Sequence, residues 1–120
     1  MTEDGSPFAI VLTTAGSDDE ASRIAAALVE RRLAACVNVV PGVVSHYRWK
    51  GKICRDEERL LLIKTSARLF PEVKHAIREL HSYELPEAVM LRIADGDPEY
   101  LAWLSAGIAP ENENGPPAER

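Results

Sequence analysis

The chain has 120 residues, of which 46% are apolar and 28% charged, and its formal net charge at pH 7 is −5. This length and composition fit one soluble globular domain, and the negative charge argues against a nucleic-acid surface, which is normally basic. Two cysteines form no disulfide framework, so we expect a reduced, cytoplasmic protein without an intrachain disulfide. The apolar run Phe8–Leu12 is too short for a signal peptide or a membrane span, so no membrane partner is expected.

The first predicted elements are a strand and a helix. Residues 8–14 form a nearly continuous apolar run with β-branched side chains, which is typical of a strand covered on both faces. Ser17 and Glu20 have the S-x-x-E spacing of a capping box, so a helix should begin here and end near Leu33 or Ala34. Its buried face repeats at helical spacing and consists of Ala21, Ile24, Ala25 and Leu28.

The longest predicted feature is a β-hairpin over residues 35–65, with its tip at Lys50–Gly51. Each arm has roughly 14 residues and would span about 45 Å. A compact domain of this size is only about 35 Å across, so the hairpin must bend, project or both. Pro41 and Gly42 suit a bulge that supplies the bend. Exposed strand edges on a projecting hairpin would invite pairing with another chain.

The remaining elements are another helix, a strand and a short helix. The returning arm of the hairpin is charged first and apolar from Leu60 onward, so its second half should be buried. Thr65 or Ser66 is predicted to cap the second helix, with Pro71 in the first turn. Residues 87–93 are the last main strand, and a short helix is predicted from Asp97–Pro98 to residue 105. Residues 1–6 and 108–120 are predicted to be disordered.

The order of these elements predicts one domain over residues 7–107 with an α+β, ferredoxin-like βαββαβ fold and a short C-terminal helix. In this fold an antiparallel sheet carries both main helices on one face. The other face is then bare. A bare sheet face together with a long, bent, projecting hairpin predicts an oligomer in which sheets pack on one another.

Several runs of this sequence form a recognisable combination that spans about residues 8–106. They are residues 30–38, 41–42, Tyr47, Trp49, 51–52, 64–65, 69–71, 81–87 and 96–101, followed by Trp103. Together these runs resemble the CutA divalent-cation-tolerance family. The resemblance implies a PII-like homotrimer whose long strands pair across subunits. It also implies a role in tolerance of copper and other divalent cations, with no established enzymatic reaction. The sequence agrees on that last point, because it has no nucleophile beside a base, no glycine-rich phosphate loop and no paired catalytic carboxylates.

His81 and Glu87 are the predicted metal ligands, six residues apart across the turn between the second helix and the last strand. The resemblance implies that copper-binding relatives use this turn and a cysteine near the end of the first strand, where this chain has Thr13 or Thr14. Neither threonine is a soft ligand, so weak binding of Cu(II) or another divalent cation is implied, and tight Cu(I) binding is not. The alternative is structural, with His81 capping the helix and Glu87 paired with Lys64.

A second predicted site is a cleft at a subunit interface, where the hairpin tip of one subunit meets the Tyr83 turn of the next. Its residues are Tyr47, Trp49, Cys54, Lys64 and Tyr83, with Glu87 as the acid. The alternative is that the aromatic residues only build the interface. Cys54 suits reaction or metal contact better than Cys36, which is predicted to be a small buried hydrophobe. The sequence thus leaves open a metal-binding trimer, a PII-like ligand-binding or signalling trimer, and a structural adaptor trimer.

Overall fold

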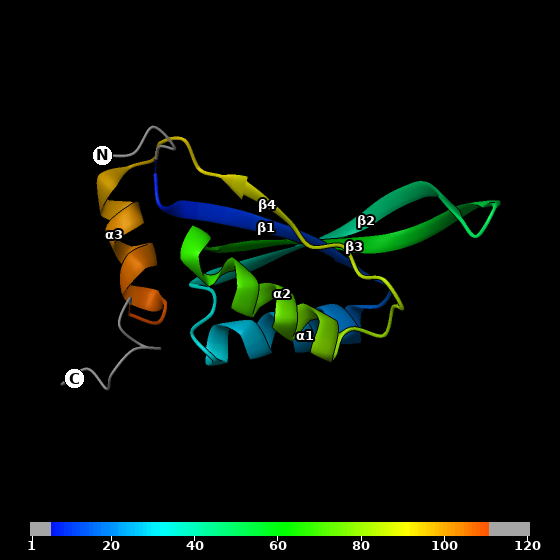
Figure 1. Ribbon diagram of the computed structural model, residues 1–120, viewed down its shortest axis with the longest axis horizontal. Coiled ribbons are helices and arrows are strands. Elements are labelled where there is room, and N and C mark those ends of the chain that lie inside the picture. The colour runs from blue at the N-terminus through cyan, green and yellow to red at the C-terminus, as the bar shows by residue number, and fades with distance from the viewer. Residues whose placement is uncertain (1–5, 111–120) are drawn as a thin grey trace.

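The computed structural model describes residues 6–110 (Figure 1). Its strands are β1 (Phe8–Ala15), β2 (Cys36–Trp49), β3 (Lys52–Ser66) and β4 (Val89–Arg92). Its helices are α1 (Asp18–Glu30), α2 (Phe70–Leu80) and α3 (Pro98–Gly107), with a short 3-10 turn, η1 (Ala67–Leu69), before α2. This order confirms the predicted α+β fold. The predictions of disorder at residues 1–5 and 111–120 lie outside the described residues.

The four strands form one antiparallel sheet in the order β2-β3-β1-β4. β3 lies inside the sheet and pairs with β1 along the whole length of that strand. Both α1 and α2 cover the same face of the sheet (Figure 1), which is the predicted ferredoxin-like arrangement. The short strand β4 and the long strand β2 are the two edges.

The hydrophobic core lies between the sheet and these two helices. Alternate residues of β1 are fully buried, and the large, fully buried side chains around them include Leu61, Ile63, Ile24, Leu28, Val73, Ile77 and Leu104. Because side chains alternate along a strand, the intervening residues point to the opposite face. On that face Val89 and Leu91 of β4 are 46% and 50% exposed. The predicted bare face of the sheet is therefore present in the single chain.

The hairpin of β2 and β3 projects well beyond the rest of the domain (Figure 1). Its arms have 14 and 15 residues, and the molecule measures 50 Å along its longest axis against 28 and 23 Å across. The pairing register shifts between Val40 and Val43, which confirms the bulge predicted at Pro41 and Gly42. Gly42 has a φ of +74°, a left-handed conformation that glycine adopts readily.

The hairpin closes through a tight turn at Lys50 and Gly51. Both residues have positive φ, 51° and 81°, as a type I′ turn requires. This turn places Tyr47 opposite Cys54, as tight pairing around the tip predicted at Lys50–Gly51 requires. The residues of β3 near the tip are mostly exposed. Glu58 is the first buried residue of the strand, and alternate burial begins at Leu61, next to the predicted change at Leu60.

The end of α1 differs from the prediction, because the helix stops at Glu30 and does not reach Leu33 or Ala34. Arg32 has a φ of 60°, which takes the chain out of the helix. The backbone N–H groups of Leu33 and Ala34 then both donate to the carbonyl of Leu28, at 3.0 and 3.2 Å. A left-handed arginine is uncommon, and the residue type alone does not indicate it.

The predicted side-chain cap of the second helix is wrong. The Thr65 hydroxyl donates to the Leu33 carbonyl at 2.7 Å, and the Ser66 hydroxyl donates to the Pro7 carbonyl at 3.3 Å. Both hydroxyls therefore tie separate segments together, and α2 begins through η1 without a side-chain cap. Pro71 does lie in the first turn of α2, as predicted.

The short C-terminal helix begins where it was predicted to begin, but it ends later than predicted. Asp97 caps α3 by accepting the backbone N–H groups of Glu99 and Tyr100 at 2.8 and 3.2 Å. The helix runs to Gly107, and the next two residues, Ile108 and Ala109, are also buried. β4, by contrast, covers only residues 89–92 of the predicted 87–93. No helix within residues 6–110 is long and apolar enough to cross a membrane.

Candidate functional site

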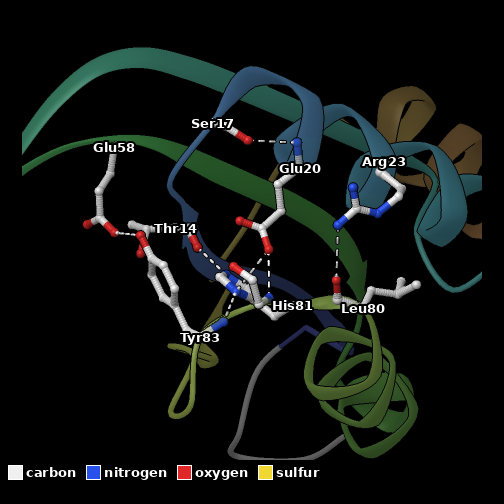
Figure 2. A network of polar contacts seen from close by, with 9 residues as sticks. Thr14, Ser17, Glu20, Arg23, Glu58, Leu80, His81 and Tyr83 are labelled. Atoms are coloured by element: carbon white, nitrogen blue, oxygen red, sulfur yellow. Dashed lines mark hydrogen bonds and ion pairs between the residues drawn. The ribbon is translucent and has the colours of Figure 1, made fainter.

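A buried histidine joins α2, β1 and the turn at residues 81–88 (Figure 2). The side chain of His81 is 0% exposed. Its Nε2 lies 2.5 Å from the carbonyl oxygen of Thr14, which can only accept, so Nε2 carries the proton. Its Nδ1 accepts the backbone N–H of Tyr83 at 3.1 Å. Both ring nitrogens are thus engaged, and the side chain bonds β1 and the turn in preference to the last carbonyls of α2.

Glu20 of α1 packs against the same histidine (Figure 2). Its backbone N–H donates to the Ser17 hydroxyl at 3.1 Å, which confirms the predicted helix cap. Its carboxylate accepts the Ser82 backbone N–H at 2.7 Å and lies 3.5 Å from His81 Nδ1. Burial alone would raise the pKa of Glu20, but the hydrogen bonding from Ser82 favours the charged carboxylate and leaves the pKa lowered. The carboxylate therefore ties α1 to the turn, a role that the capping-box spacing does not predict.

A cleft of about 440 Å³ opens where this turn meets the hairpin. It is lined by Thr14, Ser45, Tyr47, Trp49, Asp56, Glu58, Tyr83, Glu84, Leu85 and Glu87. Three aromatic rings and four carboxylates thus face one space, without a lysine or arginine among the described residues of the lining. The tip aromatics and the Tyr83 turn meet within one chain here, whereas the sequence interpretation placed that meeting between subunits.

Two tyrosine hydroxyls in the cleft donate to carboxylates. Tyr83 donates to Glu58 at 2.6 Å, and Tyr47 donates to Asp56. Burial, followed by the bond to Glu58, raises the pKa of Tyr83 above its ordinary value. The bond to Asp56 raises the pKa of Tyr47 to about 12. Both hydroxyls therefore remain protonated donors at neutral pH.

Tyr47 is expected to ionise at about pH 12, above the ordinary value of 10.0. Because the folded-state pKa is raised, the contribution of this bond to stability is complete below pH 10.0 and is lost as the pH rises toward 12. Phenolate absorbance titrations of wild type and Tyr47→Phe give the ionisation of Tyr47 by difference. Asp56→Asn removes the acceptor charge and should return the midpoint toward 10.0. A wild-type difference curve already centred there would contradict the assignment.

Glu87 is the cleft carboxylate without a hydrogen bond or ion pair among residues 6–110. Partial burial raises its pKa, and the charge of Glu58 raises it further. Lys64, its partner in the structural alternative, donates to the Tyr100 hydroxyl at 3.3 Å. Glu84, in contrast, pairs with Lys50 at 3.4 Å. The negative charge of Glu87 is therefore uncompensated within the cleft.

The predicted site residues divide into two groups. Tyr47, Trp49, Tyr83 and Glu87 line the cleft, whereas Cys54, Lys64 and His81 do not. Sequence reasoning missed the two acids of the hairpin at positions 56 and 58. The signal was available, because alternate strand residues share a face and Tyr47 was already predicted to pair with Cys54. No sequence signal indicated the contacts of Glu20 with residues 81 and 82.

The geometry does not assemble a metal site within one chain. Among the described residues, no group of three or more His, Cys, Asp or Glu side chains could hold a metal ion. His81 already uses both ring nitrogens, so its assignment as a ligand with Glu87 stays a prediction. Of the two threonines considered, Thr14 lines the cleft, whereas the Thr13 hydroxyl is buried without a hydrogen-bond partner in residues 6–110.

Comparison with protein families matches residues 9–107 of this chain to the family model of the CutA1 divalent ion tolerance protein. The divalent-cation tolerance protein CutA of Thermus thermophilus is 54% identical over 95 residues, which are 79% of this chain and 92% of that protein. The human protein CutA is 44% identical over 91 residues, which are 76% of this chain. The match covers 51% of the human protein, so this chain spans about half of that relative.

Solved structures with the same fold include relatives from several bacteria and an archaeon. The Thermus thermophilus structure has a TM-score of 0.82 at 50% identity and covers 85% of this chain and 99% of that one. CutA from Xylella fastidiosa has a TM-score of 0.84 at 41% identity, with 87% and 100% covered. A protein from Archaeoglobus fulgidus, described as a periplasmic divalent cation tolerance protein CutA, has a TM-score of 0.82 at 36% identity, with 85% and 99% covered.

Proposed function

The chain belongs to the CutA1 divalent ion tolerance protein family, and on that premise we propose that it is a non-enzymatic homotrimer that acts in tolerance of divalent cations, copper among them. The observation that carries the proposal is the family match, which extends over residues 9–107. Proteins of this family are generally assigned no catalytic activity. The cytoplasm remains our predicted compartment, although one relative is described as periplasmic.

Two surfaces support the trimer. One is the bare face of the sheet, where the apolar residues of β4 are about half exposed. The other is the projecting hairpin, on which Ile53 is 68% exposed and β2 leaves a long strand edge unpaired in the single chain. Apolar patches and open edges of this kind are ordinarily covered by another chain. Light scattering at micromolar concentration should therefore give three times the mass of the chain.

We expect any divalent cation to bind weakly, at Glu87. The negative charge of this carboxylate is not compensated by an ion pair among the described residues, and Glu87 shares the cleft with Asp56 and Glu58. Copper prefers imidazole to carboxylate ligands, but His81 would have to release the Thr14 carbonyl or the Tyr83 N–H before it could bind a metal. The cost of breaking either hydrogen bond would reduce the affinity.

Calorimetric titration with Cu(II) and Zn(II) tests this site. Exposed imidazoles bind copper by themselves, so the titrations use a background in which His46 and His75 are replaced by alanine. In that background we expect weak binding that decreases in Glu87→Gln and in His81→Ala. Glu99→Gln, which removes the same charge from exposed α3, should bind as the background does. Equal heats from all variants would show that Glu87 and His81 do not bind these metals. Circular dichroism verifies that each variant is folded.

A second candidate function is a PII-like small-ligand-binding or signalling role. The observation that favours it is the cleft of about 440 Å³ with three aromatic side chains, which has the size and lining of a small-molecule site. A thermal-shift screen with nucleotides, amines and metabolites should reveal a stabilising ligand. The third possibility, a structural adaptor trimer, predicts indifference to both metals and metabolites.

A further inference from the structure

The charge of the cleft restricts the ligand that it could hold. Its lining carries the carboxylates of Asp56, Glu58, Glu84 and Glu87, without a basic side chain among the described lining residues. A phosphate or carboxylate group placed here would meet like charge at short range, in a partly desolvated space where that repulsion is strong. The cleft is therefore suited to a cation.

The aromatic walls select among cations. In the single chain Tyr47, Trp49 and Tyr83 are 41%, 38% and 37% exposed, so their rings face the open space of the cleft there. An aromatic face attracts ammonium and guanidinium groups through its quadrupole and also covers the apolar part of an organic molecule. A bare metal ion uses convergent ligands, and the carboxylates of this chain form no such group within residues 6–110.

The chain itself places an ammonium group at the rim of this cleft. Lys50 Nζ lies 5.6 Å from the centre of the Trp49 ring and 3.4 Å from the Glu84 carboxylate. One cleft aromatic and one cleft carboxylate thus already hold an amine together. Glu87 offers a second carboxylate, which has no such partner among the described residues. Partial burial, followed by the charge of the neighbouring Glu58, disfavours the ionised form of Glu87 and raises its pKa. A ligand amine would form with Glu87 the kind of ion pair that the Lys50 ammonium group forms with Glu84.

We propose that the cleft between the hairpin and the turn at residues 81–88 binds an organic cation with ammonium or guanidinium groups, such as a polyamine. This inference rests on the proposed ligand-binding role of the cleft and adds the chemical class of the ligand. The amine lies against the aromatic walls, with one cationic end at Glu87. Anionic ligands such as nucleotides are excluded by the same carboxylates.

Isothermal titration of the chain, in the oligomer that it forms in solution, tests the proposal with spermidine and agmatine as probes. MgCl₂ at matched ionic strength controls for screening, and ATP is the anionic comparison. We expect saturable binding of both amines that weakens about tenfold in Glu87→Gln, the change for one lost charge contact of about 1.4 kcal/mol. Trp49→Leu should also weaken it. Glu30→Gln, which removes one charge from the far end of α1, should bind as wild type does.

The other outcomes separate the two proposals. Equal amine binding in all variants, or heats reproduced by MgCl₂, would overturn the organic-cation site. If ATP binds, amines do not, and Trp49→Leu loses ATP binding, then the ligand is not an organic cation. The proposal that the cleft binds a small ligand would still hold. If no probe binds and light scattering shows that Glu87→Gln changes the oligomeric state, another copy of the chain fills the cleft and both proposals fail. If no probe binds and the oligomer is unchanged, both fail as well.

Discussion

Replacing His81 by alanine is expected to lower the free energy of unfolding by about 2–4 kcal/mol. The side chain is 0% exposed and bonds the Thr14 carbonyl on β1 and the Tyr83 N–H in the turn. Its removal leaves the partly buried Thr14 carbonyl and the Tyr83 N–H without this partner, and it takes away the neighbour of the Glu20 carboxylate. Urea unfolding followed by circular dichroism measures the change.

The controls for this prediction come from the same chain. His75→Ala, on the exposed face of α2, should change the free energy of unfolding by less than about 0.5 kcal/mol. His81→Gln keeps an N–H donor for the Thr14 carbonyl and should fall between wild type and His81→Ala. If His81→Ala is as stable as His75→Ala, the hydrogen bonds of His81 contribute nothing net, and the turn is held by other contacts.

Leu61→Ala is expected to cost about 2–5 kcal/mol, because it opens a cavity in the middle of the core. Leu61 is fully buried on the inner strand β3, where it faces the two helices. β3 also pairs with strands on both sides, so the backbone around the cavity has little freedom to collapse into it. Chemical unfolding should show this loss at every protein concentration.

Leu62→Ala is the matched control, since the same side chain is removed one residue along the same strand. Leu62 points to the bare face of the sheet and is only partly buried in the single chain. If that face packs in the proposed trimer, Leu62→Ala should weaken the oligomer in dilution experiments and make unfolding more concentration-dependent. A loss of stability equal to that of Leu61→Ala, with the oligomer unchanged, would contradict the assignment of this face to an interface.

Local patterns predicted the features that depend on neighbouring residues. The continuous apolar, β-branched run over residues 8–14 and the helical stripe that follows it identified β1 and α1. Asp97 and Pro98 identified the start of α3, because a capping acid and a proline both act on the backbone within one turn. The bulge at Pro41 and Gly42 follows from the donor that proline lacks and the φ that glycine permits.

The errors occurred where a distant segment competes for a polar group. Ser66 was available to cap a helix, but the Pro7 carbonyl, 59 residues away, takes its hydroxyl. Burial of the returning arm was predicted only from Leu60 onward, yet Glu58 is 6% exposed and accepts from Tyr83. In each case the residue type was compatible with both roles, and packing selected one of them.

The sequence by itself determined the order of the elements, the long bent hairpin and the family, because burial patterns, turn residues and motifs act over short stretches of chain. Only the tertiary structure decided which polar groups meet. His81 bonds Thr14 across 67 positions, and Ser82 bonds Glu20 across 62. The aromatic tip of the hairpin and Glu87 likewise share a cleft because the antiparallel sheet brings the end of α2 beside the projecting part of β3. A hydrogen bond between distant residues needs both groups at the right distance and angle, and only the packing of whole helices and strands determines that geometry.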